Sequence, residues 1–206
     1  MKTQRNLRSR ILAALTVFAP FSAHAHHAEF MQDKPFLQGL SMPVHGVDHL
    51  LSALAVGLIA SRLGGRSRIQ LPLVFALIAV LGSFLNLGGI SLPELAVPLA
   101  AAAAGLLLSR GVAALPTSLL VVAGAGLFNG QALLESAPLT GPAAVFAAGC
   151  VLSALVLCAA GMLLGDALKL SQNVRTAKLV GAGVALLAGL AVAFPAFNNA
   201  VISLIE

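Results

Sequence analysis

PAAVFAAGCVLSALVLCAAGMLL, residues Pro142–Leu164, is a run of 23 residues without a charged side chain. A helix rises about 1.5 Å per residue, so a run of this length is long enough to cross a hydrocarbon core of about 30 Å. The stretch therefore predicts a transmembrane helix and places the chain in the all-α membrane class.

Five further apolar stretches accompany this run along the chain. They are Phe36–Ala60, Leu71–Ile90, Leu95–Leu108, Thr117–Leu134 and Leu179–Leu204. Most approach the roughly 20 residues that a spanning helix needs, and the third is short unless it extends to Leu115. The linkers between them are brief and polar, and none could hold a second domain. The sequence predicts a bundle of six transmembrane helices.

The composition excludes most soluble classes. Of the 206 residues, 59% are hydrophobic and 9% are charged, and the mean hydropathy is +0.98. Soluble domains average roughly 45–50% apolar and about 25% charged residues. This chain has too few charged groups to cover a water-facing surface, which argues against a soluble enzyme or a nucleic-acid-binding protein. The net charge of +5 is mostly due to four bases in the first ten residues.

The N-terminus has the pattern of a bacterial signal peptide. A basic segment precedes the apolar stretch Ile11–Ala19, and the small-x-small site Ala23-His24-Ala25 follows. We therefore expect residues 1–25 to be a cleaved signal peptide and residues 26–206 to form the transmembrane domain. The mature chain would start with His26-His27 in the periplasm, and the protein would reside in the inner membrane. An uncleaved anchor helix is the alternative.

Basic residues fall on alternate linkers, which predicts the orientation. The linkers on one side carry seven bases, whereas the other side carries only Lys34. The seven are Arg62, Arg66, Arg68, Arg110, Lys169, Arg175 and Lys178. Because cytoplasmic loops are enriched in Lys and Arg, these linkers are expected in the cytoplasm and both ends of the mature chain in the periplasm.

Ionisable side chains cluster inside the first apolar stretch, in GLSMPVHGVDHLLS from Gly39 to Ser52. On a continuous helix, His45, Asp48 and His49 would share one face, because they stand at i, i+3 and i+4. Burying such groups in a membrane costs at least about 2.5–3.5 kcal/mol each, so they face a cavity or a partner. Imidazoles with a carboxylate suit Ni, Co, Zn or Cu ions. A proton relay and structural hydrogen bonding remain alternatives.

The segment resembles the signature His-Pro-x-x-Gly-x-Asp-His of the HupE/UreJ family of secondary nickel/cobalt transporters. Pro43, Gly46, Asp48 and His49 match it position by position, while Met42 occupies the place of the leading His. A ligand moved one turn along the same face, to His45, would replace the missing imidazole. The signal peptide, chain length and six-span layout extend the resemblance over nearly the whole chain.

The family has a second signature in its fourth span, a Phe-His-Gly element followed by another His and a Glu. The corresponding stretch here runs from Phe128 to Glu135, with Asn129 in place of the His and Leu133 where a second His is expected. The side-chain carbonyls of Asn129 and Gln131 can bind a cation, though more weakly than imidazole. Hydrogen bonding between helices is the alternative role for both.

A histidine pair and a cysteine pair lie outside these two signatures. His26 and His27, with the free α-amino group of the mature chain, could collect a cation at the periplasmic mouth; a coincidence at the cleavage site is the alternative. Cys150 and Cys158 would lie about 12 Å apart on one helix, beyond disulfide reach. We interpret them as small buried hydrophobic residues.

The sequence leads to one main functional hypothesis, a permease for a divalent transition metal, nickel or cobalt by the resemblance. Its site would comprise Met42, His45, Asp48 and His49, with Asn129 and Gln131 opposite. The alternative is a membrane accessory protein that binds nickel or copper for a metalloenzyme without transporting it. Zinc-protease, serine-hydrolase and Walker A patterns do not occur, so we expect neither an enzyme nor an ATPase.

The expected partners follow from this hypothesis. They are the metal ion as substrate and the lipid bilayer, with no permanent cofactor and no nucleic acid. The resemblance adds a functional link to hydrogenase or urease maturation. Whether the protein forms a homo-oligomer is left open by the sequence.

Overall fold

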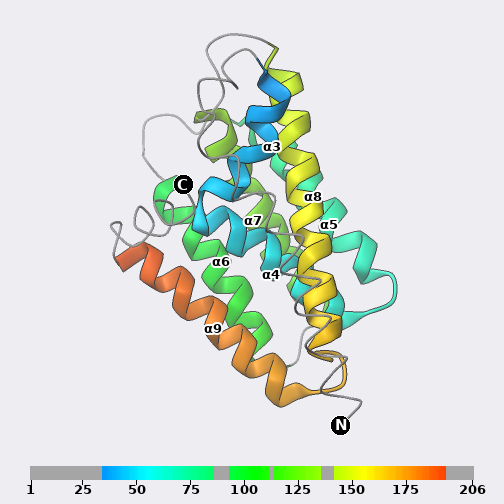
Figure 1. The fold of residues 1–206 in the computed structure, drawn as a ribbon. Coiled ribbons are helices and arrows are strands. Elements are labelled where there is room, and N and C mark those ends of the chain that lie inside the picture. Colours follow the sequence, from blue (N-terminus) through cyan, green and yellow to red (C-terminus); the bar gives the residue numbers. More distant parts are fainter. Residues whose placement is uncertain (1–33, 86–92, 112–113, 136–141, 194–206) are drawn as a thin grey trace.

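The computed structural model describes residues 34–85, 93–111, 114–135 and 142–193, and within these ranges the chain is helical and contains no strand (Figure 1). The helices are α3 (Pro35–His45), α4 (Val47–Leu63), α5 (Ser67–Gly82), α6 (Pro93–Ser109), α7 (Leu115–Glu135), α8 (Ala143–Ala167) and α9 (Val174–Ala193). The all-α class is thereby confirmed. The predicted signal peptide lies outside the described residues.

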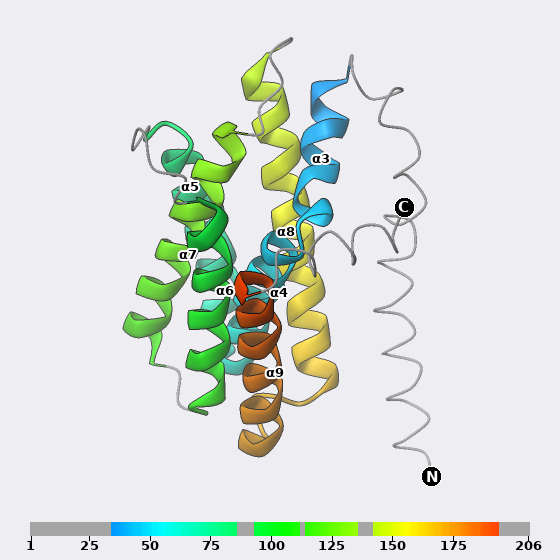
Figure 2. The same cartoon turned by 90° about the vertical axis from the view of Figure 1, so that its left-hand side faces the viewer.

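Helix α4 is the centre of the bundle. It packs against α8, α6 and α5, and more lightly against α9 and α7. Ten of its residues are buried, among them Val56 and Ile59, which are fully enclosed. Around it, α3 lies along α8 and α6 lies along α9, as both views show (Figures 1 and 2).

The outer helices present leucines to their surroundings. Leu77 on α5, Leu120 on α7 and Leu179 on α9 are each more than 60% exposed. Large exposed apolar surfaces are unusual on soluble monomers, whereas lipid covers them on membrane proteins. Among the described helices, α8 and α9 are long and apolar enough to cross a membrane, and α3 with α4 would form a third, bent span.

Each of the six predicted apolar stretches contains a helix, but three boundaries differ from expectation. Leu115 begins α7 instead of extending the third stretch, so α6 stays at 17 residues. Helix α5 ends at Gly82. Helix α9, which corresponds to the sixth apolar stretch, begins at Val174, five residues before the expected start. The count of six spans itself stays a prediction.

The first stretch is not one helix, and this corrects the expectation that His45, Asp48 and His49 share a helical face. Helix α3 ends at His45, Gly46 is extended (φ −105°, ψ 118°), and α4 begins at Val47 with a bend of 78°. Two residues favour the break. Pro43 lacks a backbone N–H, and Gly46 has no Cβ where the side chains of the next turn fold back.

Two arginines that flank the linker after α4 contact the segments after α6 and α8 at one end of the bundle. Arg62, at the end of α4, donates hydrogen bonds to the carbonyls of Ser171 (2.8 Å) and Gly111 (2.9 Å). Arg68 forms an ion pair with Asp166 at the end of α8. The linkers after α4, α6 and α8 therefore lie on the same side, as the charge pattern predicted.

Glycines allow several helix pairs to approach at backbone distance. A Cβ added to Gly126 on α7 would lie 2.6 Å from the carbonyl oxygen of Phe75 on α5, whereas one added to Gly124 would meet nothing within 4 Å. Small residues that admit a neighbouring backbone are typical of membrane helix contacts. Gly126 therefore serves the packing of α7 against α5.

This pair of glycines gives a matched test of the packing. Gly126→Ala should lower the thermal midpoint of the detergent-solubilised protein, since overpacking costs about 1–3 kcal/mol. Gly124→Ala, two residues away, should leave the midpoint unchanged or raise it slightly, because Ala favours a helix over Gly. Equal midpoints for the two variants would contradict the close approach of α5 and α7.

Candidate metal site

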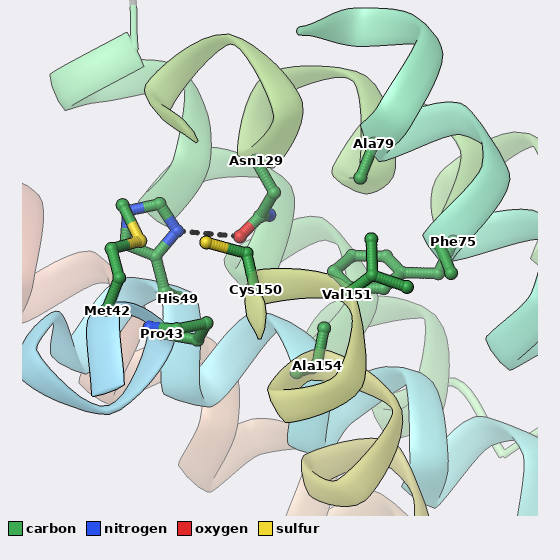
Figure 3. A pocket seen from close by; sticks show the side chains of 11 residues that line it. Met42, Pro43, His49, Phe75, Ala79, Asn129, Cys150, Val151 and Ala154 are labelled. Carbon is green, nitrogen blue, oxygen red and sulfur yellow. Dashed lines mark hydrogen bonds between the residues drawn. The ribbon is translucent and has the colours of Figure 1, made fainter. Parts of the chain in front are cut away.

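A small cavity lies beside the break between α3 and α4. Its volume is about 20 Å³, enough for about one water molecule or a single ion. Five helices contribute to its wall (Figure 3). The lining residues are Met42, Pro43, His49, Ala53, Phe75, Ala76, Ala79, Asn129, Cys150, Val151 and Ala154. Most of this wall is apolar, so its few nitrogen, oxygen and sulfur atoms determine what the cavity can bind.

His49 is held by a hydrogen bond to Asn129 on α7. The His49 Nδ1 and Asn129 Oδ1 atoms are 2.7 Å apart (Figure 3). The Asn129 amide nitrogen donates to the Ala125 carbonyl oxygen (2.8 Å) and to the Ser52 hydroxyl (3.0 Å). The backbone carbonyl of Ala125 can only accept, so the Asn129 atom that faces it must be the amide nitrogen. Asn129 Oδ1 is then the acceptor toward His49, and His49 Nδ1 must carry the proton. In the neutral ring, the lone pair is therefore on Nε2.

Asp48 and His49 fold back over the break in the chain. A Cβ added to Gly46 would lie 2.7 Å from both Asp48 Oδ1 and His49 Cδ2. The carboxylate and the imidazole thus approach the same point from the first turn of α4. Cδ2 is bonded to Nε2, so the free imidazole nitrogen lies near this edge of the ring. One carboxylate and one imidazole are thereby brought together at the start of a helix.

Only some of the predicted ligand residues lie at the cavity. Met42 lines the cavity, and Asn129, 7% exposed, contacts His49 directly. Gln131 is buried but lies away from the cavity, with its amide nitrogen 3.5 Å from the Leu85 carbonyl oxygen. His45 is the last residue of α3, and the position of its side chain lies outside the described part of the chain. His26 and His27 also lie outside it.

Cys150 is a lining residue that the sequence analysis treated as a packing residue. Its thiol is not in a disulfide, and the residue is 1% exposed. The neighbouring Gly149 provides a sequence signal for its position. A Cβ on Gly149 would lie 2.2 Å from the Phe36 carbonyl oxygen, so α8 meets α3 at backbone distance beside the cavity.

The described side chains alone do not form a group of three His, Cys, Asp or Glu residues able to hold a metal. That set excludes the side chain of His45. Met42 adds a soft thioether ligand and Asn129 a carbonyl oxygen, although this oxygen already accepts from His49. The described groups alone would therefore coordinate an ion incompletely.

Comparisons with known proteins identify one family model and a relative that match most of the chain. A family model described as "HupE / UreJ protein" matches residues 12–192. "Protein HupE" of Rhizobium leguminosarum bv. viciae is 33% identical over 190 residues, which cover 89% of this chain and 96% of that protein. No solved structure matches the chain.

Proposed function

The chain belongs to the HupE/UreJ family, and from this premise we propose that it is a secondary transporter of a divalent transition-metal cation. Nickel or cobalt is the cargo implied by the resemblance of its motif, and the direction is from periplasm to cytoplasm. The proposed site centres on Asp48 and His49, with Met42, His45 and Asn129 around them. Six spans, a cleaved signal peptide and an inner-membrane location belong to this proposal.

The break at Gly46 is the observation that carries the proposal. Secondary transporters place cation sites where a transmembrane helix is discontinuous, because the C-terminal carbonyls of a half-helix have no helical partners and attract cations. Here the C-terminal end of α3 meets the first turn of α4, which contains Asp48 and His49. Most residues that line the adjacent cavity are apolar, and ionisable groups in such surroundings are expected to act on a substrate.

The energy source fits a cation moving inward. No Walker A motif, Gly-x-x-x-x-Gly-Lys-Ser/Thr, occurs in the sequence. A membrane potential of 100 mV supplies about 2.3 kcal/mol for each charge, or about 4.6 kcal/mol for a divalent ion. The basic end of the bundle, formed around Arg62 and Arg68, supports a cytoplasmic location for the linkers after α4, α6 and α8.

A membrane accessory protein is the second candidate function. It would bind nickel or copper and deliver it to a metalloenzyme, such as a hydrogenase or urease, without moving it across the membrane. The small cavity beside His49 favours this reading, since it has room for a single ion and the described residues form no path from it through the bundle. We propose an enzymatic role in neither case.

Metal uptake separates the two functions. Cells that lack their own nickel uptake system and express this chain should accumulate radioactive Ni or Co above vector controls. Unlabelled Ni and Co should compete, with Zn and Cu as comparison ions, and a protonophore that collapses the potential should stop accumulation. If a verified, membrane-inserted protein gives no accumulation, the transporter proposal is wrong and the accessory role is favoured.

A further inference from the structure

Helices α6 and α9 pack along their length as an antiparallel pair (Figures 1 and 2). A Cβ added to Gly105 on α6 would lie 2.5 Å from the backbone nitrogen of Ala185 on α9. One added to Gly111, just after α6, would meet the side chains of Val174 and Lys178. The end of α6 therefore lies beside the beginning of α9, at the basic end of the bundle.

Each helix of this pair presents one face to its surroundings. On α6, Leu106 is exposed, and the exposed Arg110 follows it by one helical turn. On α9, Arg175, Leu179 and Leu186 are exposed and share a face, because they are spaced by four and seven residues. In both helices, a face that is apolar along its length thus has a base at one end.

The two faces lie on the same side of the pair. In each helix the face is reached one residue after a glycine at the contact, since the exposed Leu106 follows Gly105 and the exposed Ala182 follows Gly181. One residue turns a helix by about 100°, so in an antiparallel pair equal steps from the contact lead to the same side. The outer surface of α6 and α9 is therefore continuous.

The bases at this end have little negative charge to balance them. Asp166 is the acidic residue that the structure describes there, and it pairs with Arg68. Lys178 lies over Gly111, with its Cε atom 3.1 Å from the position of an added Cβ, and the Gly111 carbonyl accepts a hydrogen bond from Arg62 (2.9 Å). Two positive side chains thus converge on one turn of backbone, where they repel each other.

Helix α9 adds positive charge at the same place. The N-terminal end of a helix has a positive partial charge, so acidic residues are favoured in the first turn. Helix α9 has no acidic residue in its first turn, and it has Arg175 and Lys178 near its start instead. Within the described chain this arrangement is unfavourable, and an anion from outside the chain would relieve it.

We propose that this outer surface of α6 and α9 binds an anionic phospholipid of the cytoplasmic leaflet. The phosphate group contacts Arg110, Arg175 and Lys178, and the acyl chains lie along Leu179 and Leu186. The predicted orientation places this end of the bundle at the cytoplasmic side, where bases next to a membrane helix attract anionic lipids. The proposal gives the expected bilayer partner a lipid class and a site, and it does not depend on metal transport.

A phospholipid fits this surface better than the other possible occupants. In a symmetric dimer about an axis normal to the membrane, the bases of two copies would meet at the same end and repel each other. A free phosphate would use the bases but leave the leucines uncovered. A phospholipid matches both parts, because its charged head group and its apolar chains are joined in the same order as the bases and the leucines.

The test is lipid binding to the purified full chain in detergent, measured by native mass spectrometry. Phosphatidylglycerol is the anionic probe, and phosphatidylcholine with the same acyl chains is the zwitterionic comparison. The wild type should bind phosphatidylglycerol more tightly than phosphatidylcholine. Arg175→Gln and Lys178→Gln should each weaken phosphatidylglycerol binding about fivefold, and the double variant about 25-fold. Equal affinity of the wild type for the two lipids would overturn the proposal.

Arg66 provides a matched control. It is an exposed arginine at the same end of the bundle, at the start of α5, which packs against α7, α4 and α8. Arg66→Gln removes the same charge and should keep the wild-type affinity for phosphatidylglycerol. Thermal midpoints without added lipid should show that all variants are folded. An equal loss in Arg66→Gln and Arg175→Gln would show a diffuse effect of net charge and would reject the site.

Two further measurements separate the possible occupants. Phosphatidylglycerol should raise the thermal midpoint of the wild type, whereas inorganic phosphate alone should not. An equal rise with phosphate alone would reject a lipid as the occupant. A dimer in the native mass spectrum that is lost in Leu186→Asn would show that a second copy covers this surface, and it would overturn the proposal. Neither measurement uses metal uptake, so the lipid site and the proposed transport stand or fall separately.

Discussion

His49→Ala should reduce nickel or cobalt accumulation to the level of vector controls. The substitution removes the only imidazole that the structure places, with a described side chain, at the cavity, and it leaves Asn129 Oδ1 without its donor. Replacing a residue that only orients a metal ligand already weakens metal sites about 10–100-fold, so removing a ligand should reduce uptake by more than about tenfold. Initial uptake rates, normalised to the amount of protein in the membrane, provide the measurement.

Two companion variants define what the loss means. Asp48→Asn keeps the size of the side chain but removes its charge, and it should impair uptake in the same way. Val44→Ala, at the end of α3 and outside the cavity lining, should transport normally. If His49→Ala and Asp48→Asn both transport at the wild-type rate and at normal abundance, these residues are structural and the proposed site is wrong.

The sequence predicted the elements of the fold well because apolar length is a local property. Runs such as Pro142–Leu164 form helices whatever their neighbours do, and α8 follows that run within three residues. Helix termini were less predictable. Leu115 continues an apolar pattern by composition, yet it starts a new helix, since the chain turns at Gly111 with a positive φ of 72°.

The site was harder to predict, since it depends on contacts between distant segments. Spacing singled out Asp48 and His49 as candidates, but it assumed an unbroken helix through Gly46. The hydrogen-bond partner of His49, Asn129, comes from α7, 80 residues later in the chain, and α8 contributes Cys150 to the wall of the same cavity. Periodicity could not distinguish Cys150, which lines the cavity, from Cys158, which does not, because both are small and buried on one helix.

Gly46→Ala should reduce metal uptake strongly while leaving the protein folded. The new Cβ would lie 2.7 Å from both Asp48 Oδ1 and His49 Cδ2, closer than real contacts of this kind, so both side chains must move. These are movable side-chain atoms and not backbone, so the bundle can absorb the change. Ala also favours a helix over Gly by about 1 kcal/mol, which opposes the break between α3 and α4.

We therefore expect uptake to fall by about tenfold or more, as when a residue that orients a metal ligand is replaced. The thermal midpoint should equal or exceed that of the wild type. Gly124→Ala makes the same chemical change where a Cβ meets nothing within 4 Å, and it should leave uptake intact. Loss of uptake together with loss of folded protein would show that Gly46 serves packing alone. Normal uptake would show that transport does not require the observed placement of Asp48 and His49, because the substitution displaces both without removing either.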